Sequence, residues 1–328
     1  MIGLLIGLGI LGIAIYWTGY SKISKAMVRG GPKLFLLVLF YPVDLLSRGY
    51  GWKFVFPGSK KYSTILFITG MWFAQSVNRL VPTANIGGLI IRGRYFVKKG
   101  ADEENVIASL VADRTFHGIA TVVILILGAL LILKKPVKRE ILAIISGSCL
   151  FLIVSIYVFI RLQRSYGISR FLDRWAGNGE GLLATAEEKA REVEERLNHI
   201  YESPWPLTYS TAIRVLGDIL LAGEVWVAAR LMNTPISILD ALTLRLIAFG
   251  IRSIAFVVWG GLGVQESTYA LLSSFVGLSP ASLVAISLAT RVREIVAAII
   301  GMAFWLGREG YENVENKKLE SEEEERGT

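Results

Sequence analysis

The chain has 328 residues, of which 53% are hydrophobic and only 19% charged, and its formal net charge is +8. Together with a mean hydropathy of +0.52, this composition indicates an integral membrane protein and excludes an ordinary soluble domain. The modest positive charge favours contact with anionic lipid headgroups, and no nucleic-acid-binding motif occurs. The single Cys149 and two distant histidines offer neither a disulfide framework nor metal-site spacing, so we expect no metal and no cofactor.

Apolar segments predict an all-α, polytopic transmembrane helix bundle with about eight spans. The predicted spans cover residues 2–16, 32–46, 63–80, 106–133, 141–162, 207–232, 236–258 and 280–306. The first apolar segment has no basic region before it, so we interpret it as a retained span rather than a signal peptide. Lysines and arginines fall almost equally on alternate loops, so the sequence predicts no orientation.

The spans predict one membrane domain over residues 1–310, with a polar extramembrane insertion at 163–206 and a charged, disordered tail at 311–328. Within the insertion, residues 187–196 are rich in helix formers with opposite charges at helical spacing, which predicts a surface helix. Its apolar face is weak. A solvated helix is therefore the preferred interpretation, and docking onto the bundle is the alternative.

Pairs of charges at helical spacing occur inside two predicted spans. Asp44 and Arg48 in the second span, and Arg214 and Asp218 in the sixth, are each four residues apart. Such pairs face each other on a helix, so the simplest interpretation is a local ion pair in each span.

The fourth span carries Asp113 and His117 on one helix face. One interpretation is a self-neutralised polar cluster near the membrane surface. The other is that Asp113 is the charge partner of Arg79 or Arg92 across a cavity.

The stretch at residues 73–92 departs most clearly from a plain transmembrane helix. It combines the polar residues Asn78, Arg79, Asn85 and Arg92 with the helix breakers Pro82, Gly87 and Gly88. Non-helical backbone and buried charge at membrane depth are tolerated only where protein or a water-filled cavity surrounds them. We therefore predict a broken or re-entrant helix that lines a polar cavity.

A second stretch resembles the first. Arg252 precedes Gly260-Gly261 by eight residues, just as Arg79 precedes Gly87-Gly88, and Gly263, Gln265 and Glu266 follow. Interrupted hydrophobic segments in both halves of a membrane protein are the best sequence pointer to a transport site. The two stretches thus predict a second re-entrant segment and a candidate internal repeat.

The motifs resemble those of a known family. Arg79-Leu-Val-Pro82, Gly87-Gly88, Arg92 and Ala112-Asp113-Arg114 resemble the first motif of the lysylphosphatidylglycerol synthase transmembrane-region family, also called flippase-like or UPF0104-type. Gly261-Leu-Gly-Val-Gln-Glu266 and Arg291-Val-Arg-Glu294 are most similar to the hopanoid-associated HpnL branch. The resemblance extends over most of the chain, from about residue 5 to residue 310.

Two departures from the family pattern stand out. Many relatives carry a proline before the second glycine group, where this chain has Val258-Trp259-Gly260. The soluble aminoacyl-transferase domain of the synthases does not follow the last span. The resemblance therefore implies a flippase-like membrane domain rather than a lipid-aminoacylating enzyme.

We expect a lipid flippase of the cytoplasmic membrane that moves an anionic lipid, such as a phospholipid or a polyprenyl phosphate, through an arginine-lined cavity. Guanidinium groups bind phosphate oxygens in a bidentate manner, and helix ends at the glycine pairs offer free N–H groups. The candidate substrate-binding residues are Arg79, Pro82, Asn85, Gly87, Gly88, Arg92, Asp113, Arg114, Arg252, Gly260, Gly261, Gly263, Gln265, Glu266, Arg291, Arg293 and Glu294.

If protons drive the cycle, Glu266 is the first candidate carrier, because burial in an apolar site raises the pKa of a carboxylate. Two alternatives stay open. One is a non-transporting scaffold of a lipid or hopanoid biosynthesis complex, in which the buried charges only fix helix packing. The other is a membrane-embedded lipid-modifying enzyme, although the chain shows no nucleophile–base arrangement or nucleotide-binding loop, so we assign no catalytic residue.

Overall fold

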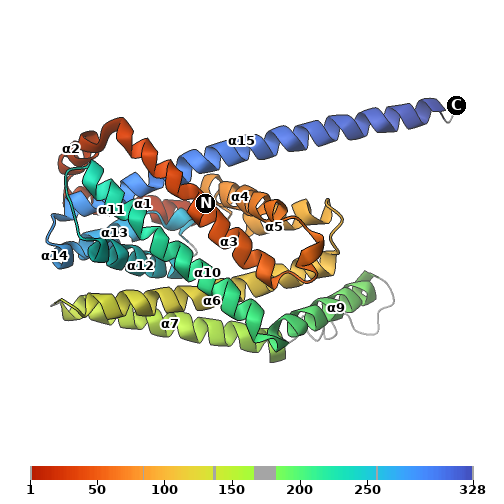
Figure 1. Cartoon of the computed structure of the whole chain (residues 1–328), viewed down its shortest axis with the longest axis horizontal. Coiled ribbons are helices and arrows are strands. Elements are labelled where there is room, and N and C mark those ends of the chain that lie inside the picture. The colour runs from red at the N-terminus through yellow and green to blue at the C-terminus, as the bar shows by residue number, and fades with distance from the viewer. Residues whose placement is uncertain (1, 84, 136–137, 166–181, 256–257, 327–328) are drawn as a thin grey trace.

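The computed structural model describes residues 2–83, 85–135, 138–165, 182–255 and 258–326 of the chain (Figure 1). The described residues form helices and no strand, which confirms the predicted all-α class. The N-terminal half contains α1 (Ile2–Thr18), α2 (Tyr20–Gly30), η1 (Gly31–Phe40), α3 (Tyr41–Val55), η2 (Ser59–Lys61), α4 (Thr64–Leu80), α5 (Ile86–Val97), α6 (Glu103–Ile132) and α7 (Arg139–Ser165).

The C-terminal half begins with α9 (Leu182–Glu202). It continues with α10 (Pro204–Leu220), α11 (Ala222–Leu231), α12 (Ile238–Ile254), η3 (Trp259–Gly261), α13 (Val264–Leu271), α14 (Ser273–Val276) and α15 (Pro280–Arg326). Residues 166–181, within the predicted insertion, lie outside the described residues.

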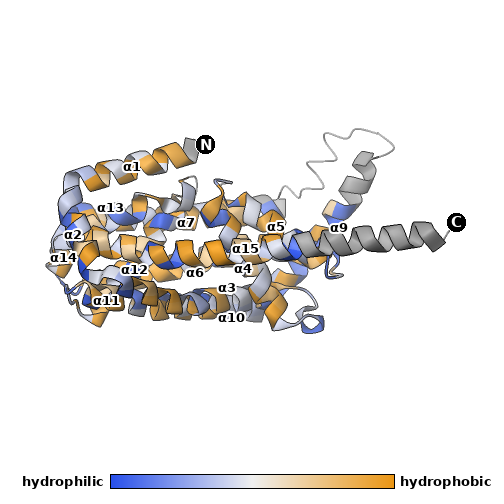
Figure 2. Ribbon diagram, turned by 90° about the horizontal axis from the view of Figure 1, so that it is seen from above, coloured by the Kyte–Doolittle hydropathy of each residue, from blue (hydrophilic) through white to orange (hydrophobic). Residues whose placement is uncertain are grey.

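Three described helical stretches are long and apolar enough to cross a membrane: Tyr20–Val55, Glu103–Ile132 and Arg139–Arg161. The first joins α2, η1 and α3 without a break, and Pro42 fits into it because it lies in the first turn of α3, where no backbone donor is needed. The shorter α1 is apolar along most of its length, whereas α2 is polar (Figure 2). The other predicted spans correspond to shorter or interrupted helices, so the count of eight stays a prediction.

Close helix contacts hold the bundle together at glycines. Gly128 on α6 and Gly250 on α12 each face the partner helix, and a Cβ atom at Gly250 would lie 2.7 Å from Leu125. Gly217 on α10 faces Ser47 on α3 in the same way. Small residues of this kind let helix backbones approach closely in membrane proteins, and α6–α12 and α3–α10 are indeed packed pairs.

Both predicted interruptions are present. The first lies between the end of α4 at Leu80 and the start of α5 at Ile86, and includes Asn85 with a φ of 65°. The second lies between α12 and α13, where Gly260, Gly261 and Gly263 all have positive φ. Positive φ is unfavourable for residues with a Cβ, so the glycines permit this second break.

The helix of the insertion is docked rather than solvated, so the preferred interpretation was wrong and the alternative holds. Val193, Leu197 and Ile200 of α9 are buried in the same apolar cluster as Val106 of α6. Arg196 also donates to Asn105 at 2.9 Å. The apolar stripe looked weak because it is narrow, but spacings of three and four residues keep it on one face.

The C-terminal segment also differs from expectation, since α15 continues as a helix to Arg326 through the predicted disordered tail. The tail is rich in glutamate and lysine, which are good helix formers. Extending an existing helix avoids the cost of nucleation, which explains why composition alone misjudged this segment.

We predict that Gly250→Leu lowers the stability of the bundle by about 1–3 kcal/mol, because the larger side chain overpacks the α6–α12 contact. Thermal unfolding in detergent measures the effect. Gly147→Leu on α7 is the control, because a Cβ atom there meets nothing within 4 Å. Equal unfolding temperatures for the two variants would contradict this close packing.

Candidate functional site

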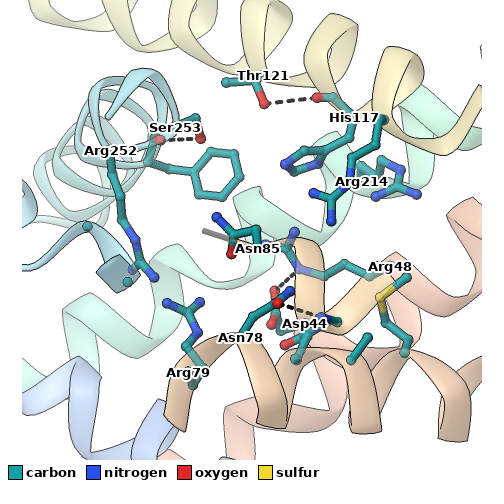
Figure 3. A pocket seen from close by; sticks show the side chains of 18 of the residues that line it. Asp44, Arg48, Asn78, Arg79, Asn85, His117, Thr121, Arg214, Arg252 and Ser253 are labelled. Atoms are coloured by element: carbon teal, nitrogen blue, oxygen red, sulfur yellow. Dashed lines mark hydrogen bonds and ion pairs between the residues drawn. The ribbon is translucent and has the colours of Figure 1, made fainter. Parts of the chain in front are cut away.

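A cavity of about 280 Å³ lies inside the bundle (Figure 3). Its lining comes from α3, α4, α5, α6, α7, α10, α12, α15 and the two interruptions. On α6, the lining residues Asp113, His117 and Thr121 lie near the middle of the helix. α6 is one of the three described helical stretches that are long and apolar enough to cross a membrane, so the cavity borders a candidate span.

The lining is strongly basic. It contains eight arginines and three carboxylates. The arginines are Arg48, Arg79, Arg92, Arg114, Arg214, Arg245, Arg252 and Arg293, and the carboxylates are Asp44, Asp113 and Glu294. Arginine keeps its charge even when buried, so each guanidinium at this depth needs a counter-charge or water.

Asp113 is the first of two shared carboxylates. It accepts a hydrogen bond from Arg92 Nη2 at 2.8 Å and another from Arg214 Nη2. The guanidinium of Arg92 also stacks over the ring of Trp52, 4.1 Å from its centroid, and Trp52 is held by a hydrogen bond to Ser109. One carboxylate therefore serves two buried arginines, and the expectation that Asp113 partners Arg92 is confirmed.

Glu294 on α15 is the second shared carboxylate. Its Oε2 lies 2.9 Å from Arg79 Nη1, and Arg252 donates to both of its oxygens at 3.0 and 3.3 Å. Figure 3 shows the guanidinium groups of Arg79, from α4, and Arg252, from α12, pointing toward each other. Glu294 thus joins the helices that precede the two interruptions.

The remaining cavity arginines differ in how they are paired. Arg48 donates to Asp44 at 2.7 Å, which confirms that local pair. Arg245 donates to Asp218 at 2.6 Å, and Arg293 to Glu224 at 2.8 Å. The side chain of Arg114 makes no ion pair or hydrogen bond with any residue that the structure describes.

The predicted local pair between Arg214 and Asp218 is wrong. Arg214 is bound to Asp113, and Asp218 is bound to Arg245. Spacing along one helix brings both side chains to the same face, but both are buried, and carboxylates and guanidinium groups of α6 and α12 lie closer to them. Long-range partners therefore replaced the local one.

At the first interruption, side chains already bind the N–H groups of the glycines. Gly88 donates to Asn78 Oδ1 at 2.9 Å, and Gly87 donates to Thr83 Oγ1 at 3.2 Å. A Cβ atom at Gly88 would collide with the carbonyl oxygen of Ala74, so this position requires glycine. These donors hold the break in place and are not free for a ligand, contrary to the expectation for the glycine pairs.

At the second interruption, Arg291 and Glu266 brace the backbone. Arg291 donates to the carbonyl oxygens of Gly260 and Gly261 at 3.0 and 2.9 Å, and to Glu266 at 2.6 Å. Glu266 in turn accepts from the N–H of Gly263 at 2.8 Å. Glu266 is fully buried, is not part of the cavity lining, and braces the interruption through these contacts. Its role as a proton carrier stays a prediction.

The predicted residues divide into two groups. Eleven line the cavity: Arg79, Asn85, Gly88, Arg92, Asp113, Arg114, Arg252, Gly260, Gly261, Arg293 and Glu294. The other six lie in or behind the interruptions, outside the lining: Pro82, Gly87, Gly263, Gln265, Glu266 and Arg291.

The sequence analysis left several lining residues out of the site. Arg48, Asp44, Arg214 and Arg245 were interpreted as local pairs or not assigned, and His117 and Asn78 were not selected. Their common signal is a charged or polar residue inside a predicted span, which by itself indicates a functional or paired position.

The two interrupted regions have a similar order of elements. In each, a helix that carries an arginine near its end is followed by a break, a short helix and a long helix. These are α4, α5 and α6 in the first region and α12, α13 and α15 in the second, which also contains η3 in its break and the one-turn α14 before α15. Contacts also correspond, since Arg92 binds Asp113 in the first half and Gln265 binds Thr290 at 3.3 Å in the second. These features support the candidate internal repeat, which stays a prediction.

Comparison of the sequence with known proteins identifies the family. The sequence model of one family, the lysylphosphatidylglycerol synthase TM region, matches residues 1–301. The chain belongs to this family. It is also similar to a UPF0104 membrane protein of Pyrococcus horikoshii, with 24% identity over 325 residues that cover 92% of each chain. No solved structure matches the chain.

Membership of the lysylphosphatidylglycerol synthase TM-region family indicates an integral membrane protein with a lipid-related function. The finer resemblance to the HpnL branch stays a prediction. Among the described residues, no group of three histidine, cysteine, aspartate or glutamate side chains could hold a metal ion. The eight arginines of the lining have the chemistry to bind an anion through their guanidinium groups.

We predict that Asp113→Asn destabilises the protein by about 3–5 kcal/mol, because it leaves Arg92 and Arg214 buried without a counter-charge. Thermal unfolding in detergent measures the loss. Glu103→Gln is the control, since its pair with Lys189 has both side chains more than half exposed and is therefore screened by solvent. A loss no larger than that of the control would contradict the role of Asp113.

Proposed function

We propose that the protein is a lipid flippase that moves an anionic, phosphate-bearing lipid across the cell membrane. The observation that carries this proposal is the buried cavity in which eight arginines face three carboxylates. A charged group at membrane depth is costly, and such residues in membrane proteins mark the pathways of ions and substrates. The basic cavity gives an acidic headgroup a route through a bilayer that it cannot cross unaided.

The size of the cavity fits a headgroup rather than a whole lipid. Its 280 Å³ correspond to about nine water molecules, at roughly 30 Å³ for each in the liquid. A phosphate with a small attached group fills such a space, whereas two acyl chains do not fit. In this mechanism the headgroup passes through the cavity while the chains stay in the surrounding lipid.

Glu294 is the element that responds to the headgroup. It holds Arg79 and Arg252, which belong to the helices before the two interruptions. A phosphate that enters the cavity competes with Glu294 for both guanidinium groups, because it offers bidentate acceptors of the same kind. When the headgroup displaces Glu294, the ion pairs that join α4 to α12 are lost, and the two helices can move relative to each other.

Residues of both interrupted regions line the cavity, which supports a mechanism in which one half of the protein moves against the other. Transporters often place their substrate between two broken helices of related repeats, and access alternates as one repeat moves. Here Asn85 of the first interruption and Gly260 of the second line the same cavity. The alternative of a non-transporting scaffold assigns the same arginines to helix packing alone, so a transport assay separates the two.

We predict that Arg79→Ala and Arg252→Ala each abolish transport of fluorescent phosphatidic acid in proteoliposomes, because each loses one of the two guanidinium groups that take over the phosphate from Glu294. Dithionite quenching of the outer leaflet measures the movement. Arg94→Ala is the control, since the Arg94 side chain is 67% exposed and lies outside the cavity. An inactive parent protein would favour the scaffold, and transport unaffected by either variant would contradict the proposal.

We predict that Glu294→Gln raises the affinity for an anionic lipid several-fold and slows transport, because neutral glutamine no longer competes for Arg79 and Arg252 and the bound headgroup leaves more slowly. Titration of the purified protein with phosphatidic acid in detergent measures affinity. Glu103→Gln again serves as the matched control. Unchanged affinity in Glu294→Gln would contradict the competition.

A further inference from the structure

The charges of the cavity do not balance. The arginine cluster, defined as the eight cavity arginines together with Arg291, is paired with six carboxylates: Asp44, Asp113, Asp218, Glu224, Glu266 and Glu294. Nine arginines against six carboxylates leave three positive charges without a fixed counter-charge among the described residues. Arginine cannot lose its proton in a protein, so the excess persists at every physiological pH.

The excess arises at identifiable places. Arg92 and Arg214 share Asp113, and Arg79 and Arg252 share Glu294, so each shared carboxylate leaves one charge uncompensated. Arg114 adds the third, because its side chain has no partner among the described residues. Arg114 follows Asp113 directly, so two of the three uncompensated charges lie on α6 or against it.

Unpaired hydrogen-bond donors exceed unpaired acceptors in the lining, just as positive charges exceed negative ones. Four lining residues each keep a buried N–H group that has no acceptor among the described residues: Gln75, Arg92, Arg114 and Arg293. Buried donors normally find an acceptor, so the lining is short of acceptor oxygens rather than of donors. A ligand that carries several anionic oxygens would supply acceptors for these donors.

We infer that the site is built for a phosphomonoester or diphosphate headgroup with at least two negative charges, and not for the singly charged phosphodiester of a common phospholipid. This inference rests on the proposed function and specifies its substrate class. A phosphomonoester has three terminal oxygens and a charge of about −1.5 to −2 at neutral pH, whereas a diester has two terminal oxygens and one charge. The first matches both the charge excess and the shortage of acceptors.

Arg114 is the residue whose substitution tests this inference. Arg114 has no carboxylate to lose, so replacing it by glutamine leaves no buried carboxylate unpaired and relieves repulsion from Arg92 and Arg214. The same substitution at Arg245 breaks its pair with Asp218. We therefore expect Arg114→Gln to unfold at the parent temperature or above, and Arg245→Gln to unfold below it.

The test measures binding to the full-length protein in a neutral detergent, with dodecyl phosphate and dodecyl methyl phosphate as monoester and diester probes. At pH 8 we expect the monoester to bind at least about tenfold more tightly, as one additional charge-assisted contact provides. The second pKa of a phosphomonoester is about 6, so at pH 5 the monoester gains a proton, carries one charge, and loses most of its advantage.

Variants and a third probe make the result decisive. Arg114→Gln should remove most of the preference for the monoester, and the exposed Arg94→Gln should retain it. Equal binding of both probes, or a preference for the diester, overturns the dianion inference while leaving transport of acidic lipids intact. If inorganic phosphate binds as tightly as dodecyl phosphate, the site still prefers a dianion, but the result contradicts the inference that the dianion belongs to a lipid. Binding of none of the three contradicts both the inference and the proposed function.

Discussion

The permanent charge of arginine inside a membrane is the constraint on which this structure depends. Lysine, histidine and the carboxylates can become neutral when they are buried, but arginine cannot, so each guanidinium must be met by a carboxylate, by water or by a ligand. The protein meets most of this demand with carboxylates from other helices, and it shares Asp113 and Glu294 between two arginines each. The interruptions, the glycines and Trp52 position these groups, and the incomplete compensation is the reason for proposing the cavity as a binding site.

The two interruptions have a structural chemistry of their own. Their glycine N–H groups bind Asn78, Thr83 and Glu266, and the carbonyl oxygens of Gly260 and Gly261 bind Arg291. Anion binding through free backbone donors, which is common at helix ends, is therefore not used at these positions. In the proposed mechanism, the side-chain guanidinium groups bind the anion, and the broken backbone moves when Glu294 releases Arg79 and Arg252.

Many of the cavity residues could be predicted from the sequence, whereas the long-range pairing of Arg214 and the docking of α9 could not, for physical reasons. Arg79, Gly88, Arg252 and Gly261 stand out because helix breakers and charges inside apolar segments are costly and therefore informative. The pairing of Arg214 with Asp113, across 101 residues, was not predictable, because spacing along one helix favours Asp218 instead. The docking of α9 was hidden by its charges, since a narrow stripe that includes Val193 and Leu197 is enough to bury one face.

The central claim is that the uncompensated arginines hold the phosphate of a lipid. The most direct test is a cryo-electron microscopy map of the protein in nanodiscs that contain a phosphomonoester lipid. The account predicts density for a phosphate inside the cavity, within hydrogen-bond distance of Arg114 and of Arg79 or Arg252. The side chain of Glu294 is then turned away from the arginine that binds the phosphate. A cavity that holds only water while Glu294 keeps both arginines, with lipid density confined to the outside of the bundle, would contradict it.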